Sequence, residues 1–324
     1  MRLQIETQLE SINDAARARI AMVLPVLKGL LFSLNNQRIE RLGGHKTVTL
    51  ADLAREYREG SGDCGICFEY AVHDAIKAKD HRVYDLISEL IDDRCGIAGG
   101  AESILFGAEK NGAVSLIETP EDWITDDARI LAGSVGQPAK LRKQWNRIKK
   151  ALRDQEARDK LPESIKGLWK ADLFVGNVNQ ERWIGTTLKI NPVDFEGAPG
   201  LRLGIYPERK QGEAPTIDED RNLILCPLPY NGSFMELFYS SFFIVKTFCA
   251  ADARIPKPVA LPNASDRHVA ALLEERREFP IIEIIDAMEP MAQPRLLKTR
   301  YVGEKQLEFD EIIAVAPVAQ LTRA

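Results

Sequence analysis

The chain has 324 residues, of which 45% are hydrophobic and 28% are charged. These proportions allow one large core or two smaller ones and argue against an intrinsically disordered chain. The formal net charge of −5 argues against a protein that coats nucleic acid through its overall charge, so any such contact must come from a local basic patch.

The amino-terminal residues predict neither export nor membrane insertion. Glu6 and Glu10 stand where a secretory signal would need an uninterrupted apolar stretch. The apolar run at residues 20–34 is interrupted by Pro25 and Lys28 and is shorter than the roughly 20 residues of a membrane-spanning helix. We therefore expect this run to be a core helix, the protein to have no membrane partner, and its location to be cytoplasmic.

The cysteines favour reduced thiols. Their number is odd, and a disulfide framework is typical of exported chains; the five are Cys64, Cys67, Cys95, Cys226 and Cys249. The first two form a CxxC motif, a spacing that zinc sites and redox pairs share. No second CxxC or histidine pair accompanies it, and Cys95 would be a third ligand only if the chain folded back. We expect thiols near a helix start, with zinc as the alternative.

Helical spacing of apolar residues dominates the first hundred positions. The first 40 residues predict one or two packed helices. A second helical stretch begins near Thr49, whose hydroxyl is placed to cap it, with the acid Asp52 three residues on. Residues 66–77 and 83–92 predict two more helices, and the first of these carries Glu69 and His73 on one face, four residues apart.

Residues 139–153 form the most strongly basic segment of the chain, with seven Lys and Arg residues and no acid. Apolar residues at helical spacing predict one packed face and one cationic face; they are Leu141, Trp145, Ile148 and Leu152. Charged runs are usually solvated helix faces, but like charges repel unless an anion lies nearby. The candidate contacts to a nucleic-acid backbone are Lys140, Lys143, Arg147 and Lys150.

After Pro162 the pattern changes to short β-branched or aromatic runs bounded by Gly, Asn and Pro. These predict four successive strands, at residues 168–175, 182–190, 201–206 and 223–226. The turn at 176–181 is short enough for an antiparallel hairpin between the first two. Further along, residues 234–248 predict a buried helix against the sheet and 265–277 another helix, while 300–315 are compatible with two terminal strands.

Three residues then stand out, because a helix carries Glu69, the first predicted strand carries Asp172 and the next carries Lys189. This order resembles the restriction-endonuclease-like (PD-(D/E)XK) superfamily, whose signature is an Asp on one strand and an acid-x-Lys on the next. The resemblance implies an α/β fold of the mixed α+β kind, in which helices flank a central mixed sheet. It covers about residues 61–250, after a helical region at 1–60 and before an extension at 251–324.

The resemblance also implies a chemistry. Glu69 and Asp172 would bind Mg²⁺ or Mn²⁺, and Lys189 would orient water or hold a phosphate oxygen. Thr187 stands where the family has its second acid, so the resemblance implies that Glu69 is recruited from the helix instead. His73 and Thr187 are secondary candidates.

We therefore expect a metal-dependent deoxyribonuclease, with DNA favoured over RNA, that serves in restriction or defence against foreign DNA. A homodimer is also expected, because its two active sites could cut both strands of a duplex in a single binding event. One alternative is an inactive nuclease-fold module that binds nucleic acid or a protein partner. Another is a structural protein in which Asp172 and Lys189 form an ordinary cross-strand pair.

Overall fold

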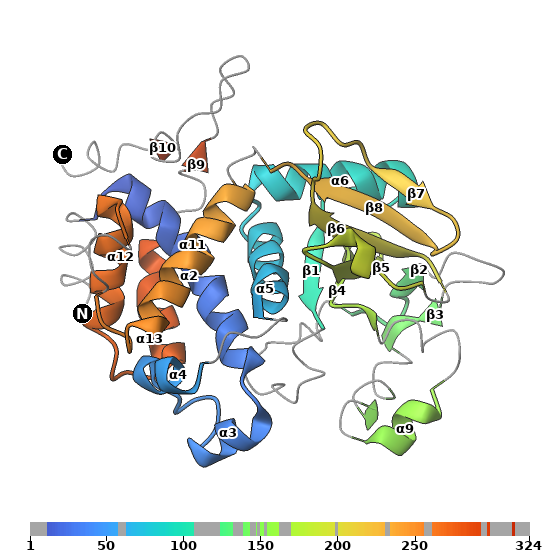
Figure 1. Ribbon diagram of the computed structural model, residues 1–324. Coiled ribbons are helices and arrows are strands. Elements are labelled where there is room, and N and C mark those ends of the chain that lie inside the picture. The colour runs from blue at the N-terminus through green and yellow to red at the C-terminus, as the bar shows by residue number, and fades with distance from the viewer. Residues whose placement is uncertain are drawn as a thin grey trace. The chain divides into compact units, whose positions relative to one another are not determined.

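The computed structural model is shown in Figure 1. It describes residues 12–57, 63–106, 124–131, 139–142, 147, 150–151, 154–161, 170–197, 200–230, 234–255, 261–292, 297–298 and 313–314. These residues form two compact units, one up to Cys67 and from Phe234 onward, the other from Phe68 to Tyr230. None of the helices in the described ranges combines the length and the apolar character needed to cross a bilayer.

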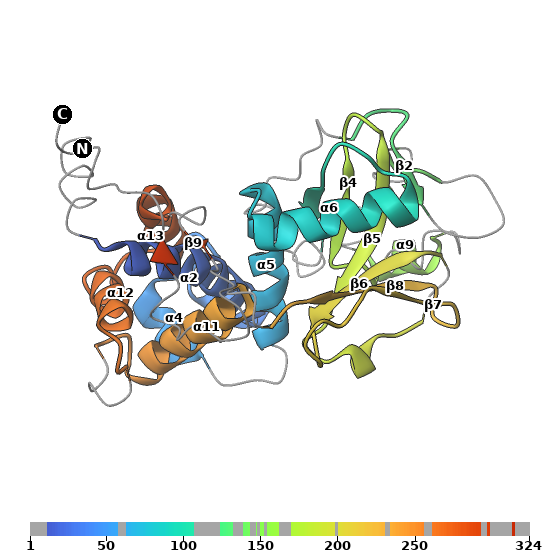
Figure 2. The ribbon, with the colours of Figure 1, turned by 90° about the horizontal axis from the view of Figure 1, so that it is seen from above.

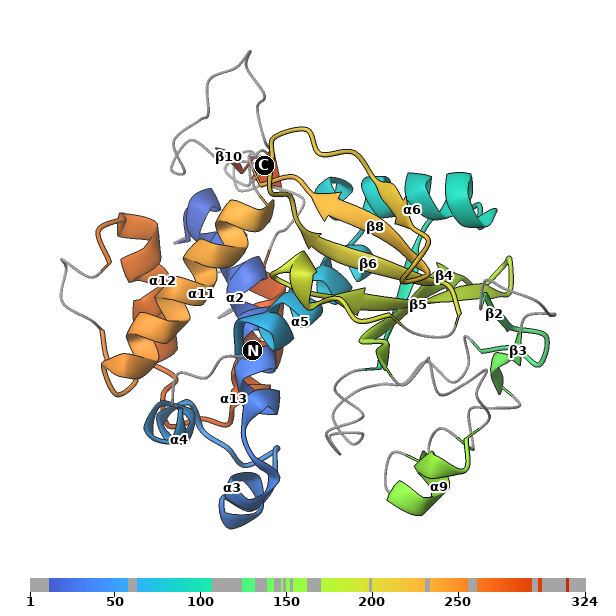
Figure 3. The same cartoon turned by 45° about the vertical axis from the view of Figure 1, so that its right-hand side comes forward.

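The first unit is helical and is built around α2 (Asp14–Ser33). Fifteen of the 20 residues of α2 are buried, including Pro25, which confirms the expected core helix. α2 packs against α11 (Phe234–Ala250), α12 (Ala264–Glu274) and α13 (Ile281–Met288), and Figure 3 shows α2 and α11 side by side. α11 was expected to pack against the sheet of the central region, but its contacts place it with the amino-terminal helices.

Short helices and strands complete this unit. α3 (Asn36–Arg41) and α4 (Leu50–Glu56) follow α2, and the 3₁₀ helix η4 (Glu289–Met291) follows α13. Near the carboxyl terminus β9 (Leu297–Lys298) pairs antiparallel with β10 (Ile313–Ala314). Two terminal strands were expected at 300–315, and the second of the observed pair lies in that range.

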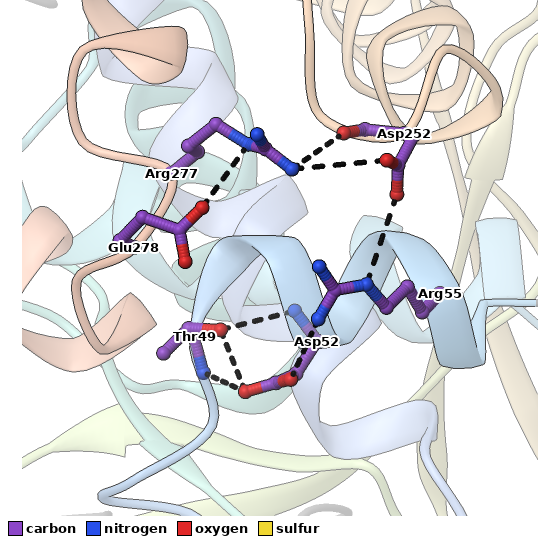
Figure 4. Close-up of polar contacts among 6 residues, drawn as sticks. All are labelled: Thr49, Asp52, Arg55, Asp252, Arg277 and Glu278. Carbon is purple, nitrogen blue, oxygen red and sulfur yellow. Dashed lines mark hydrogen bonds and ion pairs between the residues drawn. The ribbon is translucent and has the colours of Figure 1, made fainter.

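The start of α4 shows how local sequence fixes a helix end. The backbone amide of Asp52 donates to the hydroxyl oxygen of Thr49 at 3.0 Å, and the backbone amide of Thr49 donates to the carboxylate of Asp52 at 3.2 Å. These reciprocal bonds satisfy two amides that have no partner inside the helix, which confirms the predicted cap. Figure 4 shows this pair below Asp252, whose carboxylate lies between Arg55 and Arg277.

The second unit is a mixed sheet with helices. α5 (Asp63–Lys77) leads into it, and α6 (His81–Cys95), capped by Asp80, packs against β8 and runs along the sheet in Figure 2. The central strands, in spatial order, are β1 (Glu102–Leu105), β4 (Leu173–Asn177), β5 (Arg182–Leu188), β6 (Arg202–Pro207), β8 (Leu223–Leu228) and β7 (Thr216–Asp218). The fold is therefore mixed α/β, with amino-terminal helices followed by a mixed sheet packed against helices.

The predicted antiparallel hairpin is confirmed, and the later predicted strands, whose directions the sequence did not predict, are parallel. β4 and β5 are an antiparallel hairpin, and β5, β6 and β8 are parallel neighbours. β1 and β7 close the path antiparallel to β4 and β8. The 3₁₀ helix η3 (Pro192–Asp194) lies in the connection from β5 to β6, and α9 (Gln155–Asp159) lies in the segment that precedes β4.

The predicted basic helix begins differently from the expectation. β3 (Ala139–Lys140) is a strand that pairs with β2 (Arg129–Leu131), and β2 pairs with β5. Lys140 is thus on a strand, and the helical interpretation was wrong at this position because pairing with β2 overrides the local helical pattern. Helical backbone is described at 141–142, 147 and 150–151, and the rest of the predicted helix lies outside the described residues.

Side chains alternate across the sheet, which defines two faces. One, the Asp172 face, carries an apolar cluster that includes Ile104, Phe106, Phe174 and Trp183. Phe106 donates its backbone amide to the carbonyl of Asp172, continuing the register of β1 with β4, so Asp172 is on this face too. The other, the Ser103 face, carries Ser103 and Val175, which are paired in the same register.

Two helical glycines of the first unit provide a matched stability test. A Cβ at Gly29 would lie 2.6 Å from the backbone Cα of Cys67, whereas a Cβ at Gly65 would meet nothing within 4 Å. We expect Gly29→Ala to lower the free energy of unfolding by about 1–3 kcal/mol through overpacking. Gly65→Ala should raise it by up to about 1 kcal/mol, because alanine favours helix. Urea denaturation measures both, and equal effects would show that α2 and α5 do not pack this closely.

Candidate active site

Asp172 is the centre of the candidate site. It precedes β4 directly and is 8% exposed. Its Oδ2 accepts hydrogen bonds from the hydroxyl of Thr187 at 3.0 Å and from the backbone amide of Leu188 at 2.9 Å. Within the described part of the chain, Oδ1 accepts no hydrogen bond. The carboxylate is therefore oriented through one oxygen and has the other available for a ligand.

Lys189 follows β5 directly, two residues after Thr187. The alternation of side chains directs Thr187 and Lys189 to the same side, which is the Asp172 face. Lys189 is half-buried, and among the residues that the structure describes its ammonium group forms no ion pair. The structure thus brings Asp172, Thr187 and Lys189 together where β4 begins and β5 ends, as the hairpin prediction required.

A buried arginine lies beside this group. Arg202, the first residue of β6, is 2% exposed. Its Nη2 donates to the backbone carbonyl of Glu196, while its Nε is buried without a hydrogen-bond partner. Burial lowers the pKa of Arg202, and the negative charges of Asp172 and Glu196 oppose that change. The guanidinium of Arg202 therefore interacts electrostatically with both carboxylates.

The connection from β5 to β6 crosses the Asp172 face. Phe195 is buried there, in an edge-to-face contact with Tyr206 at a centroid distance of 5.9 Å. The next residue, Glu196, is exposed, and its carboxylate lies 2.6 Å from the ammonium of Lys170. The hydrogen bond and charge of Lys170 lower the pKa of Glu196, with smaller contributions from Lys189 and Arg202.

Glu69, the expected second acid, lies on α5, which touches the sheet from the opposite side. His73, one turn further along α5, has its Nδ1 2.9 Å from the hydroxyl of Ser103. Ser103 belongs to the Ser103 face, whereas Asp172 belongs to the other. Glu69 would therefore reach Asp172 only around the ends of β1 and β4, and His73 has a structural contact instead.

The four residues expected to contact a nucleic-acid backbone differ in their surroundings. Lys140 pairs with Asp127 at 2.9 Å, and its neighbour Arg142 pairs with Asp126 at 3.3 Å. Arg147 and Lys150 are exposed, and Lys143 lies outside the described residues. The two aspartates that precede β2 partly neutralise the start of the basic segment, a contact that the uninterrupted run of positive charge did not reveal.

The two cysteines of the CxxC motif are wholly or partly buried. Burial, followed by the charge of Asp63, raises the pKa of Cys64 to about 11. Cys67 is buried and its Sγ donates to the carbonyl of Val26 at 3.4 Å. The Cys64 thiol therefore favours the protonated form, whereas thiol exchange needs thiolate. In the described ranges, no group of three or more His, Cys, Asp or Glu residues is arranged to hold a metal ion.

Comparison with known protein families, with curated proteins and with solved structures finds no match for this chain. The site must therefore be interpreted from its own geometry. Three participants had no sequence signal: Arg202 looked like the start of a strand, Glu196 like a loop residue and Lys170 like part of a strand. Lys170 is close to Asp172 in the sequence, whereas the pairing of β5 with β6 brings Arg202 beside Asp172 and Glu196.

The hydroxyl of Thr187 should stabilise the site measurably. A hydrogen bond to a charged group contributes about 1.5–3 kcal/mol, so Thr187→Val should lower the free energy of unfolding by about that amount. Thr187→Ser keeps the hydroxyl and loses one methyl group, which costs about 1 kcal/mol. Urea denaturation compares them, and an equal loss for both would mean that packing, not the hydrogen bond, holds Thr187.

Proposed function

We propose that the chain is a metal-dependent deoxyribonuclease whose active site is the group formed by Asp172, Thr187 and Lys189. The observation that carries the proposal is a buried carboxylate held by the neighbouring strand, with one free oxygen, beside a lysine that has no ion-pair partner in the described residues. A cross-strand ion pair would have joined Asp172 and Lys189 directly. Because Asp172 and Lys189 do not pair with each other, Asp172 can bind a metal cation while Lys189 binds a phosphate group.

Phosphodiester substrates fit this arrangement. Three cations and two carboxylates lie in or beside the site, namely Lys170, Lys189, Arg202, Asp172 and Glu196. The excess positive charge is local, since the chain as a whole is acidic. Exposed Arg147 and Lys150 lie in the segment before β4 and would extend the contact along a nucleic-acid backbone. DNA, a restriction or defence role and a homodimer rest on the family resemblance alone.

The donor set suits Mg²⁺ or Mn²⁺. Mg²⁺ prefers oxygen ligands, keeps several waters and is often held by only one or two carboxylates together with substrate phosphates, so a site with fewer than three acids is compatible. When bound, the ion would neutralise charge on the phosphate and lower the pKa of water. Asp172 would bind it through Oδ1, while Thr187 and Leu188 keep the carboxylate fixed through Oδ2.

Lys189 has the complementary role. Its ammonium would hold a non-bridging oxygen of the scissile phosphate and stabilise the negative charge that grows there in the transition state. Arg202 donates to the main chain of Glu196 and so keeps the β5–β6 connection in place over the face. Glu69, which the family resemblance implied as a metal ligand, lies on α5 against the Ser103 face and is not part of the proposed site.

The decisive experiment is a nuclease assay on plasmid and single-stranded DNA with Mg²⁺ and with Mn²⁺. Asp172→Asn and Lys189→Met should each lower cleavage by about 100-fold or more, the usual effect of removing one group that stabilises a transition state. Lys210→Ala, which changes an exposed lysine of the β6–β7 loop, should cleave like the unaltered protein.

Two outcomes would contradict this function. Cleavage that survives Asp172→Asn would mean that the activity does not arise at this site. DNA binding without cleavage under either metal would favour the alternative, a module that binds nucleic acid and lost its chemistry with the acid at position 187.

A further inference from the structure

The proposed metal site lacks an acid, since Thr187 occupies the position from which a second carboxylate would come. An uncharged hydroxyl contributes less to cation affinity than a carboxylate. The helix residue Glu69 lies on an element that contacts the Ser103 face. A carboxylate that already lies on the Asp172 face would be a better placed substitute, and Glu196 is on this face.

The backbone at Glu196 is held over the sheet from two sides. Phe195 fills the space above Gly204, where a Cβ would come within 3.1 Å of its ring. Arg202 donates to the carbonyl of Glu196 from below. The position of residue 196 is therefore set by buried contacts, although its side chain is exposed.

The side chain of Glu196 contacts a residue that lies just before β4. Phe195 lies over β6, whereas Lys170, which binds the Glu196 carboxylate at 2.6 Å, lies just before β4. β5 is the strand between β4 and β6, so this ion pair joins residues that lie on either side of β5 in the strand order. The positive charge of Lys189 lowers the pKa of Glu196 and so favours the ionised form of that carboxylate.

We propose that Glu196 supplies the second carboxylate ligand of the divalent cation, in place of the acid missing at position 187, and that Asp172 supplies the first. This inference rests on the proposed function. Two features leave the carboxylates free to take this role. Asp172 is 8% exposed and its Oδ1 has no hydrogen-bond donor in the described part of the chain. The Glu196 side chain is 72% exposed, and exposed ion pairs such as that with Lys170 are weak, so a divalent ion can displace the lysine.

Mn²⁺ binding to the full chain, measured by calorimetry without DNA, tests the assignment apart from activity. Glu196→Gln should weaken Mn²⁺ binding by about tenfold or more, since even residues that only support metal ligands contribute that much. Asp172→Asn should weaken it at least as much. Glu69→Gln and the control Glu219→Gln, an exposed acid of the same unit, should leave the affinity within about twofold.

A second variant, which places an acid at position 187, tests whether Glu196 replaces that acid. In the Glu196→Gln background, Thr187→Glu should recover Mn²⁺ affinity, because it returns a carboxylate to the face. Thr187 is buried, so thermal unfolding must first show that the double variant folds. If it does not fold, the Glu196→Gln measurement alone decides.

The possible results separate the two proposals. If Asp172→Asn loses Mn²⁺ binding but Glu196→Gln retains it, Glu196 is not a ligand, and the nuclease proposal stands. If Glu69→Gln rather than Glu196→Gln weakens binding, the acid comes from the helix. If the unaltered protein binds no Mn²⁺ and cuts no DNA, both proposals fail.

Discussion

The two hydrogen bonds received by Oδ2 of Asp172 hold the candidate site together. They join the start of β4 to the end of β5 through one side-chain donor and one main-chain donor. A buried carboxylate is costly unless hydrogen bonds or charges compensate it, and here both donors act on the same oxygen. The second oxygen accepts no hydrogen bond among the residues that the structure describes. Asp172 is thus both a structural link within the hairpin and the residue best placed to bind a ligand.

Charge balance around Asp172 explains the rest of the arrangement. Arg202 is buried beside Asp172 and Glu196. It donates one hydrogen bond to a main-chain carbonyl, while its Nε has no acceptor among the described residues. Such a group raises the electrostatic potential of the face, because burial reduces solvent screening. Lys189 adds a second positive charge that no described carboxylate neutralises by direct contact. The face therefore carries a local concentration of positive charge even though the whole chain is acidic.

The sequence predicted where helices and strands occur better than it predicted which face of the sheet each helix or side chain lies on. The strands before and after the turn at 176–181, the buried helix α2 and the cap at Thr49 follow from local patterns, and all are present. The contact of α5 with the Ser103 face depends on how β1 pairs with β4, and β1 itself had no clear local signal. Lys140 shows the same limit, since a basic, apparently helical residue pairs with the preceding strand β2. Glu196 and Arg202 meet only because β5 and β6 are parallel, so that the connection must cross the sheet.

Thr187 gains a physical rationale from this arrangement. An acid at position 187 would lie against the buried carboxylate of Asp172, and two adjacent carboxylates repel unless a cation is always present. A hydroxyl donates to Asp172 instead, so no cation is needed to offset repulsion at this position. In the proposed site the second acid, Glu196, is on the exposed β5–β6 connection, where ionisation costs little and Lys170 pairs with it. The proposal thus assigns the hairpin bonds to Asp172 and the second metal ligand to another residue, so the hydrogen bonds that join β4 to β5 do not depend on a cation.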